Sequence, residues 1–462
     1  MTTDAPNRDP AHSAAGSLPG MVSAFAAWLA AAAVLVAAPP PGSAQEPPAG
    51  DDELWSLHDS VEVPGLESRK FGPDEYWGAV LPVVEGSPDL SVEPVGESAE
   101  GRTLRSVRFG SGETSVLLWS QMHGDEPTAT MALADIFRFF AGHPDHPIVR
   151  TIAEGATLHF VPMLNPDGAE RFQRRNAQGV DINRDARQQA TPEGRLLADM
   201  QERLEPDFGF NLHDQSARTR VEDTGRGVAI ALLAPEYNEA GDVNEVRGRA
   251  MRLAGVIRSA VEPFVGGHVA RYDADFNPRA FGDLMTKWGT STVLVESGGW
   301  RDDPQKQYLR RVNFVGLLRA LESIATGSWA DVSREPYEEL PENGRWVEDL
   351  MVLGGTLALP ELPPLEAGLL VRYEDPLERT GARVVDIGDM GEAEARDTVH
   401  LDGAWIIPDE SMLRRRAGAV QIQPDVRASF TVARDREGEH TVWVFRGRGE
   451  PPASLEGADG SR

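Results

Sequence analysis

TSVLLWSQMHGDEPTAT, residues 114–130, is the stretch that decides the fold of this chain. Its first half is an apolar run typical of a buried strand, and His123 lies just beyond that run. Gly124 permits a tight turn, and Pro127 begins a helix at a position where its missing N–H costs nothing. The turn therefore holds His123 and Glu126 at the carboxyl end of a strand, where open α/β sheets place their ligands.

A candidate metal site combines this turn with a histidine far downstream. His213 follows the apolar run FGFNL, so we expect it to emerge at the same sheet edge as His123. Together with Glu126, the two histidines would occupy three corners of a tetrahedron and leave the fourth open for water, as in a catalytic zinc site. The chain has no cysteine, so thiolate ligands are excluded. The sequence predicts one zinc ion per chain, held by His123, Glu126 and His213.

Strand-like and helix-like segments alternate around this site. Apolar runs predict strands at 91–98, 104–110, 114–121, 156–164, 208–214, 228–234 and 291–297. Helical periodicity predicts helices at 128–141, 192–204, 245–264 and 305–325. Alternation of this kind indicates an α/β sheet with helices on both faces.

The helical pattern ends after residue 326. Short runs bounded by Gly, Pro or Asp follow, at 368–375, 382–389, 403–409, 417–424, 427–435 and 440–448. We expect a small all-β domain over residues 331–449, built as a sandwich, and a disordered tail over 450–462.

The N-terminal region has the features of an export signal. Residues 24–38 form an apolar segment of the length of a secretory core, with prolines directly behind it and small residues at Gly42 and Ala44. We expect a signal peptide over 1–44, cleavage after Ala44, and a periplasmic or extracellular location. An uncleaved membrane anchor is the alternative. Residues 45–89 are expected to be a linker followed by an extension packed on the main domain.

Length and charge narrow the class of protein. At 462 residues the chain is long enough for two or three domains. Its formal net charge of −28 would repel phosphate backbones and anionic lipid surfaces, so neither nucleic acid nor a membrane surface is an expected partner. The sequence does not indicate an oligomeric state.

Three motifs together resemble a known family. HGDE at 123–126, NPDG at 165–168 and RRNAQGVDINRD at 174–185 precede a lone histidine and then a glutamate that ends a strand. This order resembles the zinc carboxypeptidases of the carboxypeptidase A type, over residues 90–326. The resemblance implies a catalytic domain in that range, with a mixed, mostly parallel sheet and helices on both faces.

The resemblance also assigns roles to individual side chains. It implies that Arg184, helped by Asn183, binds the free carboxylate of a peptide C-terminus, for which a planar guanidinium is suited. Arg174 matches the arginine that polarises the scissile carbonyl, and Arg175 is the adjacent competitor for that role. Asp181 is expected to hold the loop.

Glu296 lies at the end of the strand-like run STVLVES, with one serine between it and two glycines. In the family this position is the general base, which takes a proton from water and returns it to the leaving amine. The family's active-site tyrosine has Tyr272 as its nearest candidate. The residue that selects the terminal side chain cannot be assigned, so specificity stays open.

These expectations describe an exported zinc metallocarboxypeptidase whose substrate is a peptide with a free C-terminal carboxylate. A zinc-dependent deacylase of the aspartoacylase or succinylglutamate desuccinylase type is one alternative, although those relatives lack the NPDG segment. An amidase acting on murein stem peptides is another. A non-catalytic peptide-binding module is the alternative from outside the enzymes.

Overall fold

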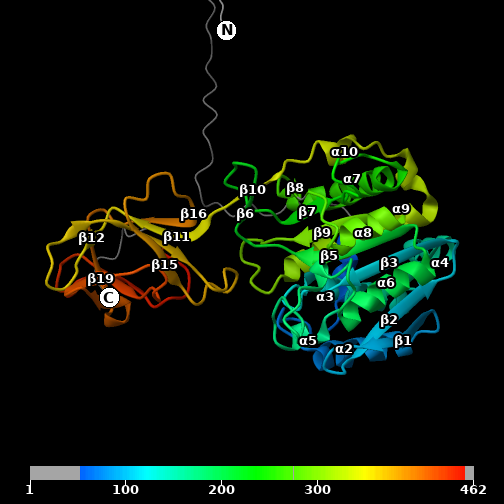
Figure 1. The fold of residues 1–462 in the computed structure, drawn as a ribbon, viewed down its shortest axis with the longest axis horizontal. Helices are drawn as coiled ribbons and strands as arrows, with labels where there is room; N and C mark the ends of the chain where they lie inside the picture. Colours follow the sequence, from blue (N-terminus) through cyan, green and yellow to red (C-terminus); the bar gives the residue numbers. More distant parts are fainter. Residues whose placement is uncertain (1–52, 274, 453–462) are drawn as a thin grey trace, which may run out of the picture. The chain divides into compact units, whose positions relative to one another are not determined.

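The computed structural model describes residues 53–273 and 275–452 (Figure 1). The predicted signal peptide, its cleavage point, the membrane-anchor alternative and the first residues of the linker lie outside this range. So do residues 453–462 of the predicted tail. Among the described residues, no helix is both long and apolar enough to cross a bilayer.

The main domain is built on an eight-stranded sheet in the order β1-β2-β4-β3-β5-β9-β7-β8. The strands are β1 Leu90–Glu97, β2 Thr103–Gly110, β3 Thr114–Ser120, β4 Ala156–Val161, β5 Phe208–Asp214, β7 Ile230–Leu233, β8 Val269–Arg271 and β9 Ser291–Ser297. The pairs β3–β4, β3–β5, β5–β9 and β7–β8 are parallel, whereas β1–β2, β2–β4 and β7–β9 are antiparallel. The predicted mixed, mostly parallel sheet is confirmed.

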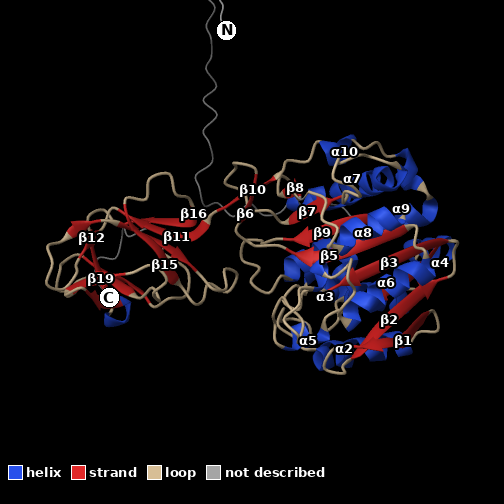
Figure 2. Cartoon of the chain, viewed as in Figure 1, coloured by secondary structure: helices blue, strands red, loops and turns tan. Residues whose placement is uncertain are grey.

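Helices cover both faces of this sheet, as predicted (Figure 2). Both faces of the sheet are apolar, because successive residues of a strand point to opposite faces. In β3, Val116 and Leu118 belong to one buried cluster, and Leu117 and Trp119 belong to another. The first cluster packs helices α1 Glu53–Val61, α2 Pro73–Glu85, α3 Thr128–Gly142, α4 Pro147–Gly155, α7 Glu245–Val265 and α9 Gln307–Thr326. The second packs α6 Pro192–Leu204 and α8 Phe281–Trp288.

The residues before the sheet form helices that the sequence did not indicate. Leu54 of α1 and Tyr76 of α2 are fully buried in the main core. A buried polar link holds this segment in place, because Asp135 of α3 accepts hydrogen bonds from the Val63 amide and from Arg310 of α9. The segment after Glu53 is therefore part of the main domain's core.

The C-terminal part contains the β domain, whose start was predicted too early. Its sheets have the orders β15-β14-β11-β16 and β13-β12-β17-β20-β21, beside the hairpin β18-β19. Their bounds are β11 Glu348–Leu353, β12 Thr356–Leu357, β13 Leu365–Glu366, β14 Gly368–Arg372, β15 Arg383–Gly388, β16 Ala395–His400, β17 Trp405–Pro408, β18 Leu413–Arg416, β19 Ala419–Ile422, β20 Phe430–Ala433 and β21 Thr441–Phe445. Both larger sheets contribute to one core, as in a sandwich.

The expected boundary at residue 331 is wrong, because the following residues pack on the main domain. Tyr337 of the short helix α10 (Glu335–Glu338) and Leu340 belong to the main core, and the Tyr337 hydroxyl accepts a hydrogen bond from the Ala234 amide at 3.0 Å. The second core begins at Leu350. Between them, β10 (Asn343–Trp346) pairs with β6 (Thr219–Val221) of the main domain.

Candidate metal centre and active site

The predicted site residues meet at the carboxyl edge of the parallel strands. His123 lies in the turn after β3, and β5 runs parallel to β3, so His213 near the end of β5 emerges at the same edge. Strand β9 is the other parallel neighbour of β5, and its register pairs Glu296 with His213. Sheet order therefore brings together three residues that span 174 positions of the chain.

His123, Glu126 and His213 form a cluster of side chains that fits one metal ion. These three residues are called the metal cluster below. Their ligand atoms lie within 4.8 Å of one another, and all three side chains are buried. Nδ1 of His123 lies 2.8 Å from Glu126 Oε1, Nδ1 of His213 lies 2.7 Å from Glu126 Oε2, and the two ring nitrogens are 3.2 Å apart. Ligands bound to one zinc at about 2.0 to 2.2 Å are separated by comparable distances. The donor set, two imidazoles and a carboxylate, suits zinc.

Electrostatics also favour a cation here. Burial disfavours the charged form of Glu126, but the two neighbouring histidines outweigh that effect and hold its pKa below the ordinary value. Burial alone would lower the pKa of His123, yet the carboxylates of Glu126 and Asp181 raise it to about 9. Burial lowers the pKa of His213. The cluster thus keeps an ionised carboxylate inside the protein, where a bound cation would compensate its charge.

Asp181 contacts the candidate metal ligand directly, which the sequence did not indicate. Its Oδ1 lies 3.0 Å from Nε2 of His123, so that nitrogen is engaged and Nδ1 is left to face Glu126 and His213. Oδ1 also accepts a hydrogen bond from the backbone N–H of Asn183 at 3.0 Å, which agrees with the expected role of Asp181 in holding the loop. The sequence showed a carboxylate inside the RNAQGVDINR motif, but no local pattern predicted its contact with His123.

The structure distinguishes the two adjacent arginines. Arg174 lines the cavity beside the metal cluster, where its Nη1 donates to Glu126 Oε1 at 3.1 Å and its Nη2 to Asp181 Oδ2 at 3.1 Å. Its side chain is 44% exposed, so it remains accessible from the cavity. Arg175 instead donates to the carbonyl of Gly179 at 2.9 Å. Arg174 is the arginine that faces the metal cluster.

Asn183 and Arg184 line the same cavity from the short helix η1 (Ile182–Arg184). Asn183 Oδ1 accepts a hydrogen bond from the Phe281 amide at 3.0 Å, which ties η1 to the start of α8. Nη1 of Arg184 donates to the Asn183 carbonyl at 2.6 Å. The pair is thus held by backbone contacts next to the cavity.

Glu296 and Tyr272 complete the set of predicted residues in this cavity. Burial, reinforced by the negative charge of Glu126, raises the pKa of Glu296 well above its ordinary value. Burial together with the charges of Glu296 and Glu126 raises the pKa of Tyr272 to about 12. Perturbation of this kind is common at functional sites.

The cavity has a volume of about 620 Å³. Besides the residues already described, its walls include Asn211, Asp214, Gln215, Ser216, Thr219, Asp283, Asn343, Gly344 and Trp346. Asp214 is a buried acid paired with Lys306 at 3.0 Å. None of these was predicted, because their strands and loops lie far apart in sequence and carry no recognisable motif.

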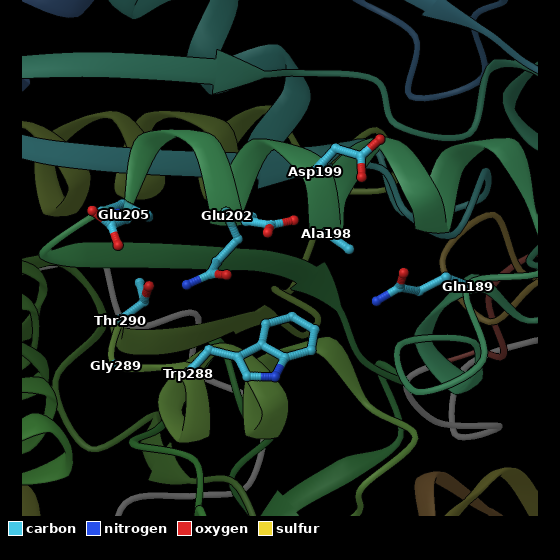
Figure 3. A pocket seen from close by; sticks show the side chains of 10 residues that line it. Gln189, Ala198, Asp199, Glu202, Glu205, Trp288, Gly289 and Thr290 are labelled. Atoms are coloured by element: carbon cyan, nitrogen blue, oxygen red, sulfur yellow. The ribbon is translucent and has the colours of Figure 1, made fainter.

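A second cavity, of about 500 Å³, lies between α6 and the end of α8 (Figure 3). Its walls include Asp199, Glu202, Glu205 and Trp288, and none of the predicted site residues. It is separate from the metal cluster.

Similarity to known proteins was found both in sequence and in structure. Residues 82–223 match the model of the zinc carboxypeptidase family. The chain is 38% identical to carboxypeptidase SOL1 of Arabidopsis thaliana over 105 residues, 21% of each chain. It is 24% identical to an uncharacterized protein of Zymomonas mobilis over 140 residues, 29% of this chain and 37% of that one.

The structure is also similar to a metallo-carboxypeptidase from Burkholderia cenocepacia, at 18% identity and a TM-score of 0.43. That match covers 57% of this chain and 70% of the other. The curated relatives are matched over only 21% and 37% of their lengths. Fold and side-chain geometry define an α/β domain with a cluster of residues that fits a metal ion. The match to the zinc carboxypeptidase family covers residues 82–223, about a third of the chain.

Proposed function

We propose that the chain is a zinc-dependent metallocarboxypeptidase that removes the C-terminal residue of peptides. The supporting observation is that the His123–Glu126–His213 cluster, Glu296 and two arginines line one cavity. A carboxypeptidase needs a carboxylate-binding cation, a proton carrier and an oxyanion partner close to the reacting bond, and all three residue types occur here.

A zinc ion held by His123, Glu126 and His213 would activate a water molecule and polarise the scissile carbonyl. Glu296 would accept a proton from that water and return it to the leaving amine. The raised pKa of its carboxyl group favours uptake of the proton. Its position at the end of β9, opposite His213, supports this role.

The arginines would recognise the substrate. Arg174, which faces the metal cluster and is accessible from the cavity, would stabilise negative charge on the carbonyl oxygen. Arg184 would form paired hydrogen bonds with the terminal carboxylate, with Asn183 and Tyr272 beside it as further donors. We also propose export, on the basis of residues 1–44 alone.

A set of matched substrates tests this function. We expect zinc-loaded protein to release the terminal amino acid from a blocked dipeptide with a free carboxylate, and to leave the same dipeptide as a C-terminal amide intact. A chelator should abolish the release and zinc should restore it. Cleavage of N-acyl amino acids but not of the dipeptide would instead indicate a deacylase, and cleavage of murein stem peptides alone an amidase. Tight binding without cleavage would indicate a peptide-binding module.

A further inference from the structure

The segment that follows the main domain contributes a wall to the active-site cavity. Strand β10 pairs antiparallel with β6, with Asn343 opposite Val221 and Trp346 opposite Thr219. The indole of Trp346 lines the same cavity as the metal cluster and Glu296, yet the residue is 57% exposed. A large apolar ring left open in a cavity is a surface that a ligand can cover.

Trp346 is held in place from beneath. The guanidinium of Arg218 lies 5.6 Å from the centroid of the indole ring, and the Val347 amide donates to the Arg218 carbonyl at 3.3 Å. Arg218 is itself fixed, because its Nε and Nη2 donate to Asp349 Oδ2 at 2.9 and 2.8 Å in a buried ion pair. The indole ring is therefore positioned by a cation–π contact with a fixed guanidinium. Little conformational entropy would be lost in ordering the ring when a ligand binds.

The strand pair β6–β10 is also hydrogen-bonded to the ends of β5 and β9, where His213 and Glu296 lie. Asn343 Nδ2 donates to Gln215 Oε1 at 2.8 Å, and the backbone N–H of Gln215 donates to the Ser297 carbonyl at 3.0 Å. Gln215 lies two positions after His213, and Ser297 directly follows Glu296. The wall formed by β6 and β10 is thus tied to the metal cluster and to the proposed base.

Asn183 and Arg184, which we propose to bind the substrate carboxylate, lie on a different part of the fold from Trp346. Asn183 and Arg184 lie on η1, which is bonded to the start of α8, whereas Trp346 lies on β10. A peptide whose carboxylate is bound at Arg184, with its last peptide bond at the metal cluster, must direct its earlier residues along the remaining walls. Trp346 is an exposed aromatic side chain on those walls.

We propose that Trp346 binds an apolar or aromatic side chain of the substrate upstream of the scissile bond, so that longer peptides are preferred to blocked dipeptides. This inference rests on the proposed carboxypeptidase function and adds a substrate class to it. Aromatic pairing and the burial of apolar surface supply the recognition. Because β10 follows the main domain in sequence, the residues that lead into the β domain would take part in substrate selection.

The test compares blocked peptides that share one C-terminal residue and contain two, three or four residues, with phenylalanine at the added positions. We expect kcat/KM of the zinc-loaded wild type to rise about tenfold from the dipeptide to the longer peptides. In Trp346→Ala the ratio of the two values should fall about tenfold, and Trp346→Phe should restore most of it. The matched control is Trp288→Ala, which removes an indole of the second cavity (Figure 3) and should keep the wild-type ratio.

The possible failures are distinguishable. A wild type that cleaves all lengths equally, or a Trp346→Ala protein that keeps the wild-type ratio, would overturn the role of Trp346 and leave the proposed function intact. An equal fall of the ratio in Trp288→Ala would overturn it as well. A zinc-loaded wild type that releases no amino acid from any of the peptides would overturn the proposed function itself, and this inference with it.

Discussion

Nε2 of His123 lies 3.0 Å from Oδ1 of Asp181, so one nitrogen of this imidazole is engaged by a carboxylate while the other faces Glu126 and His213. A contact of this kind fixes the orientation of the ring and increases its basicity as a ligand. The orientation of the His123 ring in the candidate metal site therefore depends on a residue 58 positions further along the chain.

Asp181→Asn should weaken zinc binding by about tenfold or more, because an amide orients the ring but lacks the negative charge. Competition against a chelator of known affinity measures the change. Asp145→Asn is the control, since Asp145 is an exposed acid paired with Arg150, and it should bind zinc as the wild type does. Equal affinities for Asp181→Asn and wild type would refute this role.

Glu296→Gln should keep zinc but lose about two to four orders of magnitude in kcat, because glutamine has a similar size and cannot carry a proton. Metal analysis of the purified variant and steady-state rates on a blocked dipeptide measure the two effects separately. Near wild-type turnover in a protein with full zinc content would remove Glu296 as the base.

Arg184→Lys should lower kcat/KM on peptides with a free carboxylate by about ten- to a hundredfold, since a lysine keeps the charge but cannot form two parallel hydrogen bonds. Arg175→Lys is a matched control in the same loop, because Arg175 contacts a loop carbonyl and should change kcat/KM by less than about twofold. Similar losses in both variants would assign the effect to the loop as a whole.

Burial raises the pKa of Asp283, in the active-site cavity, from the ordinary value of 3.8 to about 6. Well below pH 3.8 the carboxyl group is protonated in the folded and unfolded states alike. As the pH rises to 6 the unfolded state ionises first, so the folded protein loses stability, by up to roughly 3 kcal/mol for a shift of about two pKa units.

Asp283→Asn should therefore be more stable than wild type at pH 7, by about 1 to 2 kcal/mol since the side chain is only partly buried, and equally stable at about pH 3. Urea unfolding of both proteins at the two pH values measures the difference. A difference independent of pH would show that ionisation of this group is not its cause.

Asp135→Ala should destabilise the main domain by about 3 to 5 kcal/mol, because it removes the buried carboxylate that accepts two hydrogen bonds from the fully buried guanidinium of Arg310. The control is Asp145→Ala, which breaks an exposed ion pair and should cost at most about 1 kcal/mol. Chemical denaturation monitored by circular dichroism compares the two, and equal losses would contradict the role of Asp135.

Local sequence patterns were sufficient for the central elements. The predicted helix at 192–204 coincides with α6, which begins at Pro192 after a threonine cap and follows an apolar period. The helix predicted at 128–141 ends one residue before α3 does. Strong periodicity, caps and a strand–turn–helix signal lie within short windows, so they can be interpreted without knowing any contacts.

The sequence by itself determined the strand-end positions of His123, His213 and Glu296, because an apolar run followed by a polar residue is a local property. Only the tertiary structure decided that Arg174 rather than Arg175 faces the metal cluster, and that Asp181 contacts His123. It also decided that β10 pairs with β6 and brings Trp346 to the cavity. These features depend on sheet order, register and the path of loops between distant residues, which a local pattern does not encode.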